Sequence, residues 1–346
     1  MHFLQLTILA LHAVVVVESA KVHWTLHKSC YRNKEDTADD NELADALIRS
    51  VNEAKAWASR ASSKLSESLL PIVGSRMGRR TRQAVEPLIG VKNYPSTAKV
   101  VRDRFKKIAD LEGPVGKVAD DQGRYDKSRA WLDLKQRDDH FKNVKSLYTS
   151  HDLQVFLEQE TSGQFGGDWE KVPAPRIKAL TQRDIKVGGL PAGGRTRVPE
   201  TITFHPLWIK SQRARGFGGW NDDDLEEVTK LNALDTFKKI GAGQSPRVDI
   251  RPVDGLLKHS FTANVLHELF HLTYFGEMMD ARNGAYGWAN NVKNKDVENP
   301  DLYALIAAVI ELIYRDGKKY SVSEEGEVSF IESSALLAET MDESDE

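Results

Sequence analysis

The segment FTANVLHELFHLTYFG, residues 261–276, constrains the fold of this chain more than any other part of the sequence. Its apolar side chains surround the expected helix on nearly all sides, which predicts a helix that runs through the hydrophobic core. The same segment carries two histidines and a glutamate, and burying such groups without partners costs free energy. A metal ion would supply the missing partner.

His267 and His271 lie four residues apart, and Glu268 directly follows the first histidine. A helix completes a turn about every 3.6 residues, so the two imidazoles share one face, one turn apart. Their nitrogens can bind a single zinc ion at about 2.0–2.1 Å. Glu268 lies about 100° farther round the helix, where it can take a proton from a zinc-bound water as general base. This pattern is typical of zinc-dependent peptide-bond hydrolysis.

The alternative is a core helix in which the histidine pair occurs by chance. The chain has 10 histidines in 346 residues, and chance places such a motif in roughly two of a hundred chains of this kind. The apolar surroundings lower that fraction further, so the metal-site hypothesis is favoured.

A catalytic zinc ion needs a third protein ligand and leaves its fourth position open for water. The extension His-x-x-Gly-x-x-His is absent, because Tyr274 and Glu277 occupy those places. Gly276 is expected to end the helix, so that a carboxylate beyond it can fold back onto the histidine face. Three carboxylates remain candidates for the third ligand: Glu277, Asp280 and Glu311.

The segment FGEMMDARNGAYGW, residues 275–288, resembles the fungal aspzincins, the family of deuterolysin and the lysine-specific metalloendopeptidases. In that family, HExxH is followed by Gly-Thr-x-Asp-x-x-Tyr-Gly. The resemblance implies that Asp280 is the third zinc ligand and that Tyr286 hydrogen-bonds the developing oxyanion. Two departures are visible: the threonine is missing, and Tyr286 follows Asp280 by six residues, which leaves Asn283 in the aspartate's place.

Other stretches resemble the family more loosely: the helix expected over 41–70, ETITFHPLWI at 200–209 and NPDLYALIA at 299–307. Lysine-specific members hold the substrate lysine with an acidic pair on the last of these. Only Asp301 matches that pair here, because Ala304 stands at the place of the glutamate. A preference for lysine is therefore not implied. The family's disulfides are absent as well.

The first residues, MHFLQLTILALHAVVVVESAK, predict a signal peptide over 1–20. An apolar stretch precedes small residues that suit cleavage after Ser19 or Ala20, and the stretch is short for a membrane span. We therefore expect a secreted, extracellular protein with no membrane association after cleavage. Cys30 is the only cysteine, so an intramolecular disulfide and a zinc site built from several cysteines are excluded. With 48 basic against 51 acidic residues, no nucleic-acid partner is expected.

Periodicity and breaker residues predict the organisation of the remaining chain. Helices are expected over 41–70, over most of 97–150, and from Pro300 to just before Gly317. A basic loop is expected over 74–83, with proteolytic processing near 79–82 as one interpretation, a loop-rich middle over 162–200, and strands at 200–209 and 247–252. Residues 21–338 would form one domain, with a helical part at 40–150, an active-site part at 200–320, and an acidic tail at 339–346.

Together these observations predict an α+β fold of the zincin type, mostly helical, with a small sheet and an active-site helix that carries HExxH. The expected function is that of a secreted metalloendopeptidase with one zinc ion. A protein or peptide substrate would bind in extended form along an edge strand. The alternative is a secreted zinc-binding protein, such as an effector or a metal scavenger, with weak or no turnover.

Overall fold

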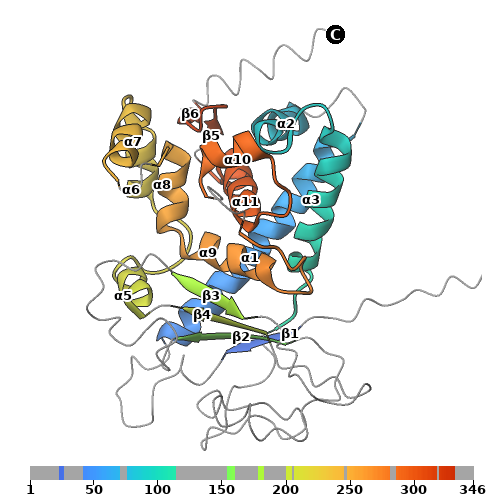
Figure 1. Ribbon diagram of the computed structural model, residues 1–346, viewed down its shortest axis with the longest axis vertical. Coiled ribbons are helices and arrows are strands. Elements are labelled where there is room, and N and C mark those ends of the chain that lie inside the picture. The colour runs from blue at the N-terminus through green and yellow to red at the C-terminus, as the bar shows by residue number, and fades with distance from the viewer. Residues whose placement is uncertain are drawn as a thin grey trace, which may run out of the picture.

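The fold is α+β, with a helical majority packed on one face of a small mixed sheet (Figure 1). The computed structural model describes residues 23–26, 42–70, 76–113, 154–159, 178–182, 200–204, 206–244, 248–280, 286–317 and 319–331. The predicted signal peptide, Cys30 and the acidic tail lie outside these residues. Within the described part of the chain, no helix is both long and apolar enough to cross a membrane.

The helices are α1 (Glu42–Ser68), α2 (Arg76–Ile89), α3 (Tyr94–Ala109), α5 (Pro206–Ala214), α6 (Asp222–Val228), α7 (Ala233–Ala242), α8 (Pro252–His259), α9 (Phe261–His271), α10 (Trp288–Asn294) and α11 (Pro300–Tyr314). The strands are β1 (His23–Leu26), β2 (Gln154–Gln159), β3 (Ala179–Gln182), β4 (Glu200–Phe204), β5 (Lys319–Val322) and β6 (Val328–Ile331). The predicted helix at 41–70 and the helix that starts at Pro300 are thus confirmed. Of the strand predicted over 200–209, Glu200–Phe204 is a strand, whereas residues 206–209 belong to α5. Pro206 ends the strand and opens α5.

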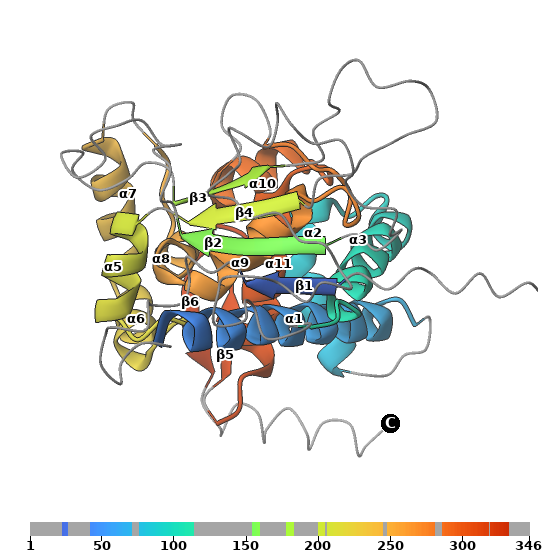
Figure 2. The same ribbon diagram turned by 90° about the horizontal axis from the view of Figure 1, so that it is seen from below.

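The main sheet has four strands in the order β1-β2-β4-β3, and β5 and β6 form a separate antiparallel pair. Strands β1, β2 and β4 are parallel, whereas β3 runs antiparallel to β4 at the edge, with Thr181 opposite Ile202. Ile202 and Phe204 of β4 are fully buried. Figure 2 shows this sheet from below, with α9 and α11 behind it.

Helix α9 lies between the sheet and α11, and it also contacts α1 (Figure 1). Its N-terminus is capped by Ser260, whose hydroxyl accepts a hydrogen bond of 2.9 Å from the backbone N–H of Ala263. Phe270 is fully buried. Its ring packs on Phe105 of α3 and Tyr303 of α11, with centroid distances of 5.6 and 4.2 Å. The predicted core position of this helix is confirmed.

The basic loop predicted over 74–83 is wrong, because α2 begins at Arg76. The first half of the buried face of α2 is formed by small or polar residues, Gly78, Thr81 and Ala84, and larger apolar residues follow only at Val85, Leu88 and Ile89. Thr81 hydrogen-bonds the hydroxyl of Tyr314 at 2.8 Å. Arginines at the intervening positions hid this helical spacing in the sequence. Processing near 79–82 stays a prediction, and it would require cleavage inside a helix.

Two further differences concern short strands. The strand predicted over 247–252 is wrong, because residues 248–251 form no strand and Pro252 opens α8. The edge strand β3 and the β5–β6 hairpin were not predicted. Each of these strands spans four residues, which is too short for a reliable alternation of apolar and polar side chains. The loop-rich middle therefore contains the strand that borders the candidate site.

We expect Phe270→Ala to lower the free energy of unfolding by about 3–5 kcal/mol, because it leaves a cavity next to the rings of Phe105 and Tyr303. The measurement is urea unfolding followed by circular dichroism. Leu231→Ala is the matched control, because Leu231 is fully exposed and its truncation should change stability by less than about 0.5 kcal/mol. Equal effects of the two substitutions would contradict this assignment of the core.

Candidate metal centre

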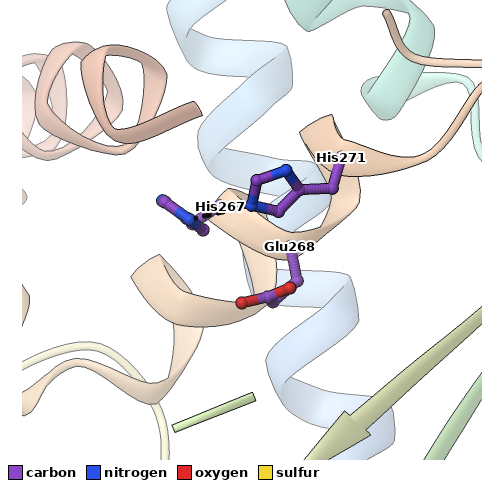
Figure 3. Close-up of side chains that lie close together, drawn as sticks. All are labelled: His267, Glu268 and His271. Atoms are coloured by element: carbon purple, nitrogen blue, oxygen red, sulfur yellow. Dashed lines mark hydrogen bonds between the residues drawn. The ribbon is translucent and has the colours of Figure 1, made fainter. Parts of the chain in front are cut away.

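His267 and His271 lie on one face of α9 and turn toward each other, as the sequence predicted. Their Nε2 atoms are 3.2 Å apart and their ring centroids 4.9 Å apart. Figure 3 shows the two imidazole rings side by side, with the Glu268 carboxylate near them. The potential ligand atoms of these three residues all lie within 4.8 Å of one another. They form a group that could hold a metal ion.

The chain turns back sharply after the second histidine. Helix α9 ends at His271, five residues before the predicted end at Gly276, because Leu272 is already extended with ψ 143°. The carbonyl of Leu272 accepts hydrogen bonds from the N–H groups of Gly276 and Glu277 at 3.3 and 3.1 Å. Gly276 has φ 146° and Glu277 has φ 56°, both in the region that reverses a chain direction. Met278 N–H then donates to the carbonyl of Phe270 at 3.2 Å.

This turn brings Asp280 to the histidine pair. Asp280 Oδ1 lies 3.3 Å from His267 Nε2 and 3.5 Å from His271 Nε2. With the 3.2 Å between the two nitrogens, the three atoms form a nearly equilateral triangle. Ligands at about 2.0–2.1 Å from a tetrahedral zinc ion are about 3.3–3.4 Å from each other. The triangle therefore has the size of one face of a zinc coordination tetrahedron.

The tautomer of His271 also suits a metal ligand. Its Nδ1 lies 2.9 Å from the carbonyl oxygen of Met278. A carbonyl can only accept, so Nδ1–H must donate, and Nε2 is left with its lone pair directed into the triangle. Backbone carbonyls commonly orient metal-binding histidines in this way. The chemistry of the donor atoms thus fits a divalent transition metal.

Charges in the triangle are strongly coupled. Burial lowers the pKa of His267, but the hydrogen bond with Asp280 and the nearby carboxylates outweigh it, so that this pKa is raised. Burial alone would raise the pKa of Asp280, yet the hydrogen bond and charge of His267 lower it to about 2. Without a metal, the contact between His267 Nε2 and Asp280 Oδ1 at 3.3 Å holds these two side chains together. A metal ion would take the place of the proton.

Glu268 is held by the edge strand of the sheet. The side chain is 9% exposed, and its Oε2 accepts a hydrogen bond of 2.5 Å from the hydroxyl of Thr181 in β3. This contact holds the carboxylate next to the two histidines. Sequence analysis missed Thr181, because a threonine in a short unpredicted strand carries no pattern of its own.

Tyr286 lies at the mouth of the site. Its ring stacks on His267, with centroids 5.8 Å apart and an interplanar angle of 21°, and its hydroxyl hydrogen-bonds the carboxylate of Asp280. Burial, followed by the charge of Asp280, raises the pKa of the phenol above its usual range, so the hydroxyl keeps its proton and remains a donor. The ring is 56% exposed and therefore accessible to a substrate.

The other candidate residues have different places. Glu311 forms an ion pair with Arg60 at 3.0 Å, and the charged groups around it do not include either histidine. Glu277 is exposed on the turn. Asp301 is buried in the first turn of α11, where Oδ2 accepts hydrogen bonds of 2.8 Å from Gly287 N–H and from the Asn291 amide. Asp301 is thus engaged with the chain itself and does not form an open pocket for a lysine side chain.

Comparisons with protein-family models, with curated proteins and with solved structures found no match to this chain. The resemblance to the aspzincins therefore rests on sequence motifs alone.

We expect the free energy of unfolding of Glu311→Gln, relative to that of the wild type, to increase as the pH rises. Burial raises the pKa of Glu311 to about 7, so the folded chain binds a proton that the unfolded chain has lost, and the free energy of unfolding decreases from about pH 4.5 to pH 7. The substitution removes this contribution.

Urea unfolding of both proteins at pH 5 and pH 8 measures the effect. The stability of the variant relative to the wild type should rise by roughly 2 kcal/mol between these pH values. Glu226→Gln is the control, because Glu226 is exposed on α6. A difference that does not change with pH would show that Glu311 is ionised normally in the folded chain.

Proposed function

We propose that this chain is a secreted zinc-dependent metalloendopeptidase. The observation that carries the proposal is the triangle formed by His267 Nε2, His271 Nε2 and Asp280 Oδ1. In a catalytic zinc site, two imidazoles and one carboxylate can occupy three of the four coordination positions, and the fourth is left for water. When bound there, zinc would polarise a water molecule and lower its pKa toward 7.

Glu268 would act as the general base. Its carboxylate is beside the triangle and is oriented by Thr181, so it can accept a proton from the attacking water and pass it to the leaving amine. Tyr286 would donate its hydroxyl proton in a hydrogen bond to the oxyanion that develops on the substrate carbonyl. A protein that only stores or scavenges metal has no need for such a base and donor.

The edge strand supports a peptide as substrate. Strand β3 is the last strand of the four-stranded sheet and is paired on one side with β4. Its other edge can form backbone hydrogen bonds with an extended peptide. Because Thr181 in this strand contacts Glu268, a peptide bound there would lie next to the base.

The test is zinc content and peptide cleavage, measured on the full chain and on Glu268→Gln. We expect one zinc ion per chain in both proteins, and a rate of cleavage that is about 10²–10⁴-fold lower in the variant, as for loss of a general base. Glu226→Gln serves as the control, because Glu226 is exposed on α6, which supplies no residue to the site. Zinc binding with no cleavage by either protein would favour the alternative of a zinc-binding effector or scavenger. Absence of bound zinc would contradict both functions.

We further expect Thr181→Val to lower kcat about tenfold with zinc content unchanged, because the hydroxyl that orients Glu268 is lost. Thr181→Ser keeps the hydroxyl and should retain most of the activity. Steady-state kinetics on one fluorogenic peptide compares the two variants. If Thr181→Val and Thr181→Ser are equally active, the hydrogen bond between Thr181 and Glu268 does not contribute to catalysis.

A further inference from the structure

The backbone that follows Tyr286 is held by two carboxylates from different helices, the half-buried Asp254 and the buried Asp301. Gly287 N–H donates to Asp301 Oδ2 of α11 at 2.8 Å, and Trp288 N–H donates to Asp254 Oδ1 of α8 at 2.7 Å. Two consecutive N–H groups of one turn are therefore anchored to two helices. This arrangement lies next to the metal centre but contributes no ligand to it.

Asp254 uses both of its oxygens for the backbone. Oδ1 accepts from Trp288, and Oδ2 accepts from the N–H of Arg251 at 2.8 Å, which caps the start of α8. Such a pair of acceptors is specific to a carboxylate, because an asparagine offers only one oxygen. The close approach also requires a glycine: Gly287 has φ 87°, and a Cβ at this position would lie 3.3 Å from Asp254 Oδ2.

The position of Tyr286 depends on this anchoring. Tyr286 is 56% exposed. Besides the stack on His267 and the hydrogen bond to Asp280, little packing holds its side chain in place. Trp288, two residues later, is 1% exposed, and its indole N–H donates to the carbonyl of Glu324 at 2.8 Å. The chain is thus fixed just beyond Tyr286, and Asp254 is the group that joins this fixed point to α8.

We propose that Asp254 is a positioning residue that keeps the Tyr286 ring over His267, and so sets the oxyanion donor relative to the metal centre. The catalytic part of this inference rests on the proposed function. The positional part concerns the chain alone and can be tested without any activity.

The experiment compares Asp254→Ala, Asp254→Asn and Asp235→Ala in the full chain as purified. Asp235 is the matched control, because it occupies the same third position of the neighbouring helix α7 and is exposed. Backbone amide exchange reports whether Trp288 N–H is still bonded. The proton chemical shifts of the His267 ring report the stacked Tyr286, and Tyr286→Ala defines their values without the ring.

We expect Asp254→Ala to speed the exchange of the Trp288 amide and to move the His267 shifts toward those of Tyr286→Ala, whereas Asp235→Ala changes neither. Asp254→Asn keeps one acceptor oxygen, which can bond the N–H of Trp288 or that of Arg251. The His267 shifts should stay near wild type if the Trp288 amide remains protected from exchange, and they should move if only the Arg251 amide does. If the Trp288 amide becomes exposed while the His267 ring keeps its wild-type shifts, the positioning role is wrong.

In an active enzyme, kcat of Asp254→Ala should fall at least about tenfold with KM within about twofold, as when an oxyanion donor is displaced. The effect should vanish in a Tyr286→Phe background, where the donor is already absent. Multiplicative effects of the two substitutions would overturn the catalytic part of the inference. A wild-type chain without hydrolytic activity would refute the proposed function, and the His267 shifts would still decide whether Asp254 positions Tyr286.

Discussion

The hydrogen bond between His271 Nδ1 and the carbonyl of Met278 is the interaction on which the candidate site depends. It fixes the tautomer of His271 and thereby points a lone pair toward His267. It also ties the returning chain to the end of α9, and Asp280 follows two residues later. The carbonyl of Met278 thus orients His271 and also places the chain so that Asp280 lies next to both histidines.

The surroundings of α9 keep this geometry rigid. The helix is packed between the sheet and α11, and its apolar residues are buried by α1, α3 and α11. Two polar contacts enter this apolar environment from outside the helix: Thr181 reaches Glu268, and Glu53 of α1 accepts a 2.5 Å hydrogen bond from the Thr262 hydroxyl. Buried polar groups with satisfied hydrogen bonds specify one arrangement of the core. The two histidines and Glu268 are therefore built on a rigid element, whereas Asp280 and Tyr286 are the exposed part of the site.

Much of this could be predicted from the sequence because the signals are local. The apolar helix with His267 and His271 follows from helical periodicity, and the return of Asp280 follows from the glycine-containing turn. The end of α9 was placed too late because Leu272, Tyr274 and Phe275 continue the apolar pattern of the helix, whereas the turn is made by backbone hydrogen bonds that leave no sequence pattern. Thr181 and Asp254 could not be found, because their roles come from strand pairing and from contacts between α8 and the Tyr286 turn. Helix α2 was hidden because the first half of its buried face uses glycine, threonine and alanine.

The central claim is that His267, His271 and Asp280 bind one zinc ion and leave its fourth position open. X-ray absorption spectroscopy at the zinc edge of the purified, zinc-loaded chain tests this directly. The account predicts four-coordinate zinc with two imidazole nitrogens and two oxygens, all at about 2.0–2.2 Å, and loss of one imidazole in His271→Ala. A six-coordinate, all-oxygen environment, or a spectrum unchanged by removal of His271, would contradict it.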